Sequence, residues 1–534
     1  MTTPGKRPAF LRDATGIVRG ISPRSAFITT VIVTNLGFGG ATMYSFVPFL
    51  WPGSNQPLAL LLVLPFMIVH SAMYTLLAWA MPRAGGDYVW TGRILHPALG
   101  LSLNLTWVVY GSLFMGSYAN YTITYGLYSI FLAFGIATRN YGLVDWSRAV
   151  FTSPFWIITF ATIFLIYVSL IMIFGLRTHL KHQLVAWIVG MVGTIVALVL
   201  FLNTTPTQFA VAFDSLMGRY STYQGVIDTA KSYGFSWAPS LAATFAAMAF
   251  AWEVNNGYQY SGYFAGELKQ TRKSMFYSTI GNNLFCTFFF VLFAWAFVSA
   301  VGENWNTSLS YLAYAQSSAY KLPLVPNAYL LASLLTNNLA LVLLINIGFI
   351  VWAMTVPANW MAWTRIILAQ SFDRVLPSKL ADVSDRYHSP VNAIIFVAVI
   401  NWIGMVASTV YGLLFANLNF ILMYTIALSI GGLTGALFPF IAKSFYEKSP
   451  LVRYKVGGVP LVTITGIITF LFFAYLAFAA GLNPVIGGPT NPVAMIVLLL
   501  SFVGSGCLYY VAKMYHKSKS GIDIALNFKE IPPE

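Results

Sequence analysis

The first long apolar run of the chain, Ser25–Leu50, contains in its middle the stretch Thr34-Asn35-Leu36-Gly37-Phe38-Gly39-Gly40-Ala41-Thr42. Each glycine destabilises a helix by roughly 1 kcal/mol relative to alanine, so three of them within four residues favour a local unwinding. In a membrane, unwound backbone is tolerated only where it lines a cavity inside the protein. The alternative is a continuous helix that packs closely against a neighbour through its small residues. The stretch therefore predicts either a broken helix beside a cavity or a close helix crossing.

A second interruption lies in the apolar run Leu241–Phe264, which contains the polar stretch Trp252-Glu253-Val254-Asn255-Asn256-Gly257-Tyr258. Spans that are interrupted at corresponding positions of the two halves of a chain are the best sequence indication of a transport site near the middle of the membrane. The two runs correspond as helices one and six of two inverted five-helix repeats. Together they favour broken helices at both positions.

The composition excludes a soluble globular protein. Of the 534 residues, 58% are hydrophobic and only 8% are charged, whereas soluble domains carry about 25% charged residues. Aromatic residues make up 16% of the chain, which suits rings at membrane interfaces. The net charge of +14 does not indicate a nucleic-acid partner, because the basic residues lie in short loops between apolar runs.

Twelve apolar runs are long enough to cross a bilayer as helices, which takes about 20 residues. Continuous runs favour helices over the short alternating strands of a barrel. We therefore predict an all-α integral membrane protein with about twelve transmembrane helices, built as a five-plus-five inverted repeat with two further C-terminal helices. The runs are 25–50, 58–80, 101–134, 154–174, 184–202, 241–264, 278–300, 339–368, 391–410, 418–442, 460–480 and 492–512.

Basic residues divide unevenly between the two sides of such a bundle. Of the 29 Lys and Arg residues, 24 fall on one side, and the other side receives only Arg139, Arg148, Arg219, Lys231 and Lys321. Because basic residues accumulate in cytoplasmic loops, we expect a multi-pass protein of the cell (plasma) membrane with both termini cytoplasmic. The first run is too long for the core of a cleaved signal peptide and is expected to be a retained span.

These runs and loops divide the chain into six parts. We expect a cytoplasmic N-terminal segment, a first five-helix repeat, an extracellular loop, a second inverted repeat, two additional transmembrane helices and a cytoplasmic tail, at residues 1–24, 25–202, 203–240, 241–442, 443–512 and 513–534. A second long outer loop covers 301–338, and each long loop is expected to hold a short helix. Cys286 and Cys507 fall in apolar runs and are expected to be core residues rather than a disulfide.

Glu253 is the only acidic residue that lies deep in a predicted span. A carboxylate in lipid is costly and marks a functional site by default. Three interpretations remain: it pairs with a substrate ammonium, it binds a proton, or it faces outer water as part of a gate. His70, in the second run, is interpreted as a satisfied packing residue rather than a proton carrier.

Four segments follow one another in a characteristic order. They are the break 37–40, then Met81-Pro82-Arg83-Ala84-Gly85-Gly86-Asp87-Tyr88, then Gly257-Tyr258 with Gly266-Glu267-Leu268-Lys269 and Arg272, and finally Thr364-Arg365 with Asp373-Arg374-Val375-Leu376-Pro377 and Ser389-Pro390. In this order they resemble the amino acid–polyamine–organocation transporter superfamily, of the amino acid permease type. The resemblance covers about 25–442, and the last two predicted helices fit by number and hydropathy alone.

The resemblance implies a secondary transporter that works by alternating access, with a site near the membrane midplane between the two breaks. A substrate carboxylate would meet backbone amides at the start of a half-helix, near Gly37, Gly39 and Gly40. A substrate ammonium would meet carbonyls near Ala251, Asn255 and Asn256. Phe38, Trp252 and Tyr258 are the candidates for a gate or a side-chain pocket, and Glu253 and Gly257 complete the predicted site.

The chain departs from the family pattern at three places. Gly-Phe-Gly stands at residues 37–39 where the family has small–Ser–Gly, and Gln270-Thr271 replaces an Asn-Pro pair. Gly190 stands where proton-coupled, sodium-independent members often carry a lysine in the fifth helix. This last difference argues against a lysine-based proton mechanism.

The run 339–368 contains a candidate sodium site. Pro357 cannot donate to the carbonyl of Ala353, so that oxygen and the Thr355 hydroxyl are available as ligands. Together with the carbonyls of Leu36 or Gly37, they would form an oxygen cage for Na⁺. The alternative is a simple proline kink in which Thr355 bonds its own backbone. Sodium symport, proton symport through Glu253 and uncoupled exchange therefore stay open.

The leading hypothesis is a secondary active transporter for an amino acid or a related small-molecule amine. The alternative within this class is a polyamine or cationic-amine carrier or exchanger. The alternative of another class is a non-transporting sensory or accessory membrane protein of the same fold. An enzyme is not expected, because the sequence offers no metal-ligand cluster, phosphate loop or nucleophile–base set. Apart from a coupling Na⁺ or H⁺ no cofactor is expected, and the expected partners are the substrate and the lipid bilayer.

Overall fold

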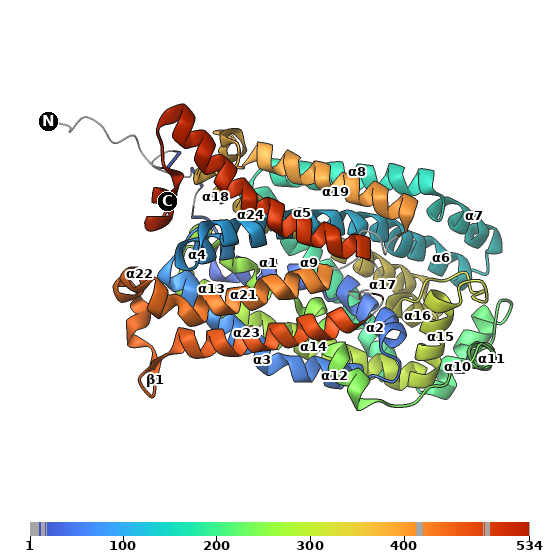
Figure 1. Cartoon of the computed structure of the whole chain (residues 1–534). Helices are drawn as coiled ribbons and strands as arrows, with labels where there is room; N and C mark the ends of the chain where they lie inside the picture. Colours follow the sequence, from blue (N-terminus) through green and yellow to red (C-terminus); the bar gives the residue numbers. More distant parts are fainter. Residues whose placement is uncertain are drawn as a thin grey trace.

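The computed structural model describes residues 10–11, 16–17, 19–412, 420–483, 485 and 492–532, without the side chains of residues 42, 354, 355 and 492–494. In this part the long helices lie side by side along one direction (Figure 1). Ten of them are long and apolar enough to cross a membrane. With two further, broken spans, the structure confirms the predicted all-α bundle of about twelve membrane-spanning helices.

The ten spans include seven continuous stretches of α-helix and three composite ones. The continuous ones are α3 Gln56–Ala80, α8 Pro154–Ile173, α9 Leu176–Leu202, α19 Val391–Tyr411, α21 Phe420–Ile441, α23 Leu461–Leu482 and α24 Pro492–Ser520. The composite ones are α5 Pro97–Tyr121 with η1 Thr122–Leu127 and α6 Tyr128–Ala137, α13 Thr271–Phe276 with η4 Tyr277–Gly281 and α14 Asn282–Val301, and α17 Leu339–Val351 with η5 Trp352–Thr355 and α18 Val356–Phe372.

The two broken spans are the first and the sixth, as predicted. The first consists of α1 Pro23–Thr34 and α2 Phe38–Leu50, and the span is bent by 59° between its parts Pro23–Ala41 and Met43–Leu50. The sixth consists of α12 Leu241–Asn255 and the 3-10 turn η2 Tyr258–Gly262. Each part alone is shorter than the roughly 20 residues that a membrane-spanning helix needs.

Short elements gather at the two ends of the bundle (Figure 1). One end carries α4 Asp87–Ile94, α22 Lys443–Lys448 and the hairpin of β1 Lys455–Val456 with β2 Val459–Pro460, and the opposite end carries α7 Tyr141–Phe151, α10 Pro206–Met217, α11 Tyr223–Ser232 and α15 Glu303–Ala315. Following the predicted orientation, we name these the inner end and the outer end. Each long outer loop holds two helices rather than the one expected, since α16 Ala328–Ser333 follows α15.

Local sequence explains where several helices begin. The hydroxyl of Ser22 accepts a hydrogen bond from the Ser25 amide at 3.2 Å before α1, and Asn55 Oδ1 accepts from the Leu58 amide at 2.9 Å before α3. Thr205 and Gln208 form a reciprocal capping box at the start of α10. Such caps satisfy amides that have no partner inside the helix.

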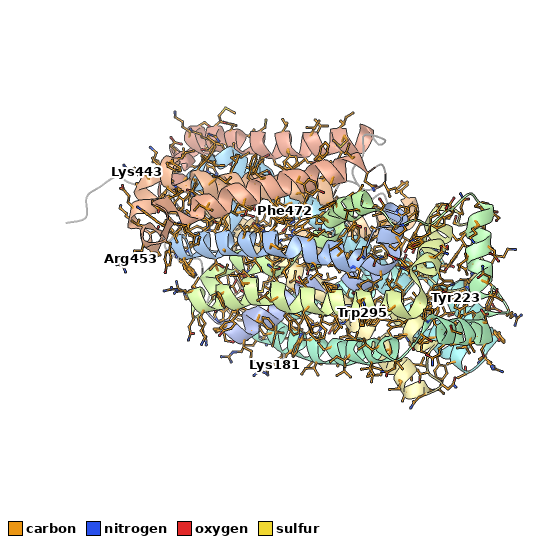
Figure 2. The ribbon with its side chains drawn as sticks, turned by 90° about the horizontal axis from the view of Figure 1, so that it is seen from below. Lys181, Tyr223, Trp295, Lys443, Arg453 and Phe472 are labelled. Carbon is orange, nitrogen blue, oxygen red and sulfur yellow. The ribbon has the colours of Figure 1, made fainter. Side chains whose placement is uncertain are left out.

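The flank of the bundle is apolar. Lys443 and Arg453 lie at the inner end, Tyr223 lies at the outer end, and Trp295 lies between them (Figure 2). Trp295 is 55% exposed in the protein alone. Close helix crossings use small residues, as is common in membranes: a Cβ atom at Gly116 of α5 would lie 2.1 Å from the Asn401 carbonyl oxygen of α19.

Candidate substrate-binding cavity

The two breaks meet in the middle of the bundle. A Cβ atom at Gly257 would lie 2.5 Å from the Thr34 amide nitrogen, so only glycine lets the sixth span approach the end of α1. Asn35 follows Thr34 with a left-handed backbone, φ 59°. Its side-chain oxygen accepts from the Phe38 amide at 2.9 Å, and its carbonyl accepts from the Gly39 amide at 2.9 Å. Asn35 therefore ends α1 and also accepts from two amides at the start of the outer half-helix α2.

The polar residues of the sixth break are held by neighbouring groups. Asn255 Nδ2 donates to the Ala251 carbonyl at 2.9 Å, and its oxygen accepts from the Thr287 hydroxyl at 3.1 Å. Asn256 Nδ2 lies 3.5 Å from Glu253 Oε2, and its side-chain oxygen accepts from Gln259. These bonds fix Asn256 beside the Glu253 carboxylate.

A cavity of about 400 Å³ begins at the two breaks. It is lined by Thr34, Asn35 and Gly39 from the first break and by Glu253, Val254 and Asn256 from the sixth. Further lining comes from Tyr314, at the end of α15, and from Tyr411, at the end of α19, so the cavity extends toward the outer end. Among its described lining residues, Glu253 is the only charged one.

Aromatic rings form most of the cavity wall. Eleven lining residues carry one: Phe46, Phe49, Phe114, Tyr118, Tyr121, Tyr125, Phe250, Tyr260, Tyr314, Tyr411 and Phe420. Several pack on one another, with ring centroids 5.1 Å apart for Phe46 and Tyr314 and 4.3 Å apart for Phe114 and Phe420. The Tyr125 and Tyr314 hydroxyls are 3.2 Å apart. A carboxylate within an aromatic wall is a suitable environment for an ammonium group attached to an apolar body.

Three of the predicted substrate-binding residues line this cavity, namely Gly39, Glu253 and Asn256. Phe38 instead stacks on Phe349, with centroids 4.4 Å apart. The other predicted residues also lie beside the cavity rather than in its wall: Gly37, Gly40, Ala251, Trp252, Asn255, Gly257 and Tyr258. Their roles as substrate ligands stay predictions.

Trp252 and Tyr258 belong to a buried network below the cavity. The Trp252 indole donates to the Tyr258 hydroxyl at 3.3 Å, and that hydroxyl lies 2.6 Å from His70 Nδ1. The His70 ring also packs edge-on against Phe473, with centroids 4.8 Å apart. His70 therefore packs as predicted, but its polar groups are only partly satisfied, because Nε2 is buried without a hydrogen-bond partner among the described residues.

The two segments that carry the predicted sodium ligands are in contact through Trp352. Gly37 packs against the η5 turn that contains Ala353 and Thr355, because a Cβ atom at Gly37 would lie 2.2 Å from Trp352 Cδ1. The side chain of Thr355 is outside the described part, and the sodium site stays a prediction. Among the described residues, no group of three or more His, Cys, Asp or Glu could hold a metal.

Trp352 fills the space beside Gly190, the position where related transporters often carry a lysine. A Cβ atom at Gly190 would lie 2.8 Å from Trp352 Cε2, and the indole nitrogen donates to the Thr194 hydroxyl at 3.1 Å. A larger residue at 190 would require the indole to move.

The inner side of the pathway is closed by contacts between distant segments. Arg365 on α18 forms an ion pair with Glu267 in η3 Ala265–Glu267, at 2.6 Å. The carbonyl of Glu267 accepts from the amides of Gly20 and Ile21 at 3.1 and 3.0 Å. The Gly85 amide before α4 donates to the Tyr263 carbonyl at 2.8 Å. The cavity thus extends toward the outer end of the bundle, whereas these contacts join segments at the inner end.

Sequence reasoning predicted none of the eleven rings of the aromatic wall. They come from six α-helices, α2, α5, α12, α15, α19 and α21, and from the short elements η1 and η2. Rings in spans are equally typical of the membrane interface. The inner-gate residues Glu267 and Arg365 do lie in the segments that carry the family resemblance. The sequence therefore indicated both residues, but it did not indicate that they form an ion pair.

Comparisons with known proteins show which family the chain belongs to. The sequence pattern of the family described as "Amino acid permease" matches residues 25–502. Among solved structures, the chain is similar to MhsT in complex with L-phenylalanine, with 14% sequence identity, a TM-score of 0.49, and coverage of 90% of this chain and 98% of that one. A search among curated proteins finds no match. Because the family pattern covers most of the sequence, the chain belongs to the amino acid permease family.

Proposed function

We propose that the chain is a secondary active transporter that carries an amino acid, or a closely related amine, across the cell membrane by alternating access. The observation that carries this proposal is the cavity between the two breaks, whose described lining holds one carboxylate, Glu253, and eleven rings. The carboxylate takes the substrate ammonium, with Asn256 beside it, and the rings take an apolar side chain.

The substrate carboxylate has a separate place in this scheme. The amides of Phe38 and Gly39, which start the outer half-helix, donate to Asn35. A substrate carboxylate at this helix start would replace the Asn35 side chain as acceptor for the Phe38 amide, and the partial positive charge of the helix end favours that exchange.

Alternating access requires the inner contacts to open as the outer ones close. The outward extent of the cavity and the closed inner side support this cycle, in which the Glu267–Arg365 pair separates in the inward-facing state. We propose that the inner end, with its many basic residues, faces the cytoplasm and that both termini lie there. The proposal keeps two alternatives for coupling. One is Na⁺ at the site of Gly37 and Thr355, and the other is a proton on Glu253.

A cationic-amine carrier is the second candidate, and the observation in its favour is that Glu253 has no positively charged residue beside it in the described cavity wall. Uptake into proteoliposomes separates the candidates. A panel of labelled amino acids and polyamines is tested with and without a sodium gradient and with and without a pH gradient. Accumulation of an amino acid supports the leading proposal, and accumulation of polyamines alone supports the second. No uptake or exchange under any gradient contradicts both.

A further inference from the structure

The segment after α24 folds back onto the inner end of the bundle. It comprises Asp523, the 3-10 turn η8 Ile524–Lys529 and the residues up to Pro532. Ile524 and Asn527 are fully buried and Phe528 is 5% exposed, whereas Leu526 in the same turn is 50% exposed. One face of this segment is therefore docked and the other is free. We call residues 523–532 the strap.

The surface beneath the strap contains a buried ion pair. Arg93 of α4 lies 3.0 Å from Asp373, which directly follows α18, and the two side chains are 0% and 1% exposed. The Tyr88 hydroxyl, also from α4, donates to Asp373 at 2.9 Å. This cluster joins the segment after the second span to the inner end of the eighth.

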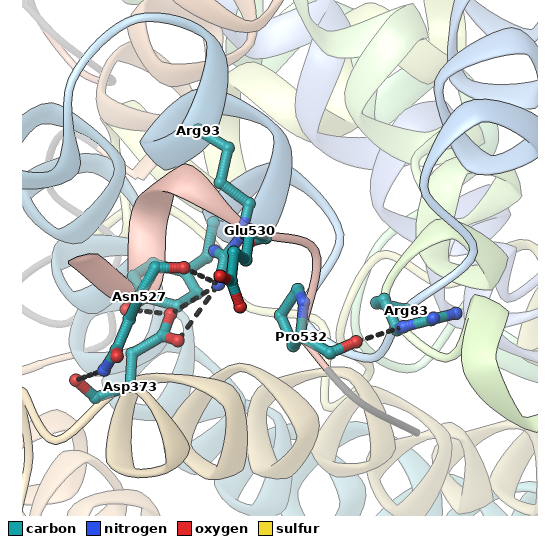
Figure 3. A network of polar contacts seen from close by, with 7 residues as sticks. Arg83, Arg93, Asp373, Asn527, Glu530 and Pro532 are labelled. Carbon is teal, nitrogen blue, oxygen red and sulfur yellow. Dashed lines mark hydrogen bonds and ion pairs between the residues drawn. The ribbon is translucent and has the colours of Figure 1, made fainter. Parts of the chain in front are cut away.

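The strap supplies further partners of that cluster, as Figure 3 shows. Arg93 Nε donates to the Glu530 carbonyl at 2.9 Å, and Asn527 Nδ2 donates to the Asp373 carbonyl at 3.0 Å. The Arg93 guanidinium lies over the Phe528 ring, 5.1 Å from its centroid. A further bond runs from Arg83 Nε, before α4, to the Pro532 carbonyl at 2.5 Å.

The strap thus spans two elements that close the inner side of the pathway. The loop before α4 is bonded to the exit of the sixth span through Gly85 and Tyr263, and α18 is bonded to the same exit through Arg365 and Glu267. Any movement that separates α4 from the end of α18 must break either the bond of Asn527 to Asp373 or the contacts of Phe528 and Glu530 with Arg93.

We propose that the strap is a releasable lock on the inner gate: docked, it holds α4 against the end of α18, and undocked, it allows the inward-facing state to form. The inference rests on the alternating access proposed above. It predicts that weakening the strap moves the equilibrium toward the inward-facing state, because the docked segment stabilises the inner-closed state alone. A segment at the membrane surface with one docked face is accessible to cytoplasmic factors that would release it.

The test uses the full-length chain in liposomes and a reporter that does not depend on the substrate. The prediction that both cysteines are core residues is wrong for Cys507, which is exposed, whereas Cys286 is buried. Cys507→Ser is therefore introduced first. Gln370→Cys then places a thiol at a fully buried position of α18, three residues before Asp373. The rate at which a membrane-permeant maleimide alkylates this thiol measures opening of the inner end.

Phe528→Ala and Asn527→Ala are each expected to raise the alkylation rate by about tenfold or more, since losing a buried ring or a buried hydrogen-bond donor shifts a two-state equilibrium by at least that factor. The matched control Leu526→Ala, on the free face of the same turn, is expected to leave the rate unchanged. Thermal unfolding of each variant in detergent accompanies the measurement.

An unchanged alkylation rate in both Phe528→Ala and Asn527→Ala overturns the proposal. If these variants are less stable to heat but are not alkylated faster, the strap only contributes packing, and the proposal is overturned as well. Uptake is measured separately. An unmodified chain that carries nothing contradicts the proposed function, while the alkylation rates still decide whether the strap holds the inner end closed.

Discussion

Glu267 and Arg365 form a bidentate ion pair between two segments that are 98 residues apart in the sequence. Arg365 Nε lies 2.6 Å from Glu267 Oε1, and Nη2 lies 3.0 Å from Oε2. The Arg365 and Glu267 side chains are only 6% and 1% exposed, respectively. Because the Glu267 carbonyl also receives the amides of Gly20 and Ile21, this one residue connects the start of the first span, the exit of the sixth and the eighth.

Glu267→Gln tests the energetic weight of this pair. It leaves the Arg365 guanidinium buried without a counter-charge, which costs about 3–5 kcal/mol of stability. We expect a clearly lower midpoint of thermal unfolding in detergent. The double variant Glu267→Gln with Arg365→Met removes the stranded charge and is expected to recover most of the loss.

The control for this prediction is an exposed pair at the same end of the bundle. Lys443 and Glu447 lie 3.7 Å apart with side chains that are 73% and 60% exposed. Glu447→Gln is expected to leave the midpoint unchanged within error, because exposed pairs contribute little. A Glu267→Gln protein that melts like the unmodified one contradicts the assignment of Glu267 as the counter-charge of Arg365.

Glu253→Gln tests whether the carboxylate in the cavity binds a positively charged side chain of the substrate. If it pairs with a side-chain ammonium, uptake of cationic solutes falls by about 30-fold or more, the factor that follows from losing one partner of a buried charge pair. Uptake of a neutral amino acid is then nearly unaffected. The measurement is the initial rate of uptake for both kinds of solute in proteoliposomes.

Glu303→Gln is the matched control, since Glu303 lies in α15 and not in the cavity wall. It is expected to leave both rates unchanged. Equal loss of cationic and neutral uptake in Glu253→Gln, with normal folding, is the result expected from the leading proposal, in which the carboxylate takes the α-ammonium group, and it would also follow from proton coupling. Selective loss of cationic uptake supports the cationic-amine carrier.

The breaks could be predicted from sequence because their cause is local. Clustered glycines and a polar stretch inside apolar runs disfavour a continuous helix wherever the run lies. Which side chains the breaks bring to the cavity depends on more distant parts of the chain. Trp252 and Tyr258 were expected at a gate or a side-chain pocket. Trp252 bonds to Tyr258, whose hydroxyl lies beside His70, and neither ring is among the cavity-lining residues, so their roles stay predictions. Packing against neighbouring helices determines which face of a broken helix points into the cavity. A uniformly apolar run has no hydrophobic periodicity from which that face could be predicted.

The aromatic wall and the strap escaped prediction for a related reason. Tyr118 and Tyr121 lie in a long apolar run, where rings are equally typical of core packing and of the membrane interface. Phe528 lies in a short polar tail, where sequence alone gives no reason to expect a buried ring. Both roles depend on residues far away in the chain, such as Tyr314 for the wall and Arg93 for the strap.

Asp87 at the start of α4 gives the structure a predicted pH dependence. It accepts hydrogen bonds from the hydroxyls of Tyr74 and Tyr263, the latter at 2.7 Å. Burial nevertheless raises the pKa of Asp87 to about 6 from an ordinary 3.8. The folded protein therefore holds this proton more tightly than the unfolded chain does, so the contribution of Asp87 to stability falls as the pH rises from about 4 to about 6.

Asp87→Asn removes the titration while keeping an oxygen for the two tyrosine hydroxyls. The variant is expected to match the unmodified protein near pH 4 and to be more stable above pH 6, by at most about 3 kcal/mol for a shift of two units. The difference between the two thermal midpoints, measured from pH 4 to pH 8, isolates this group. Asp385→Asn, at an exposed position, serves as the control. If the difference in thermal midpoint stays constant from pH 4 to pH 8, the stability of the protein does not depend on the titration of the buried Asp87, and the prediction is wrong.

Gly257→Ala tests whether close approach of the two breaks is required for a competent site. The added Cβ would lie 2.5 Å from the Thr34 amide nitrogen and 2.6 Å from the Thr34 hydroxyl. Since the nearest of these atoms is backbone, the sixth span must move away from α1, and the cavity wall formed by Thr34, Glu253 and Asn256 moves with it. We expect assembled protein with substrate affinity reduced by about tenfold or more, as misplaced ligands cost at least that factor.

Gly504→Ala is the control, because a Cβ atom there meets nothing within 4 Å and the residue lies inside α24. It is expected to keep the affinity and to be slightly more stable, as alanine favours helix over glycine. Affinity is measured by binding of the substrate identified in the uptake panel to purified protein. Unchanged affinity in Gly257→Ala would mean that the breaks can separate without disturbing the ligands. The substrate would then bind to the cavity wall farther out, among the rings, and not at the junction of the first and sixth spans.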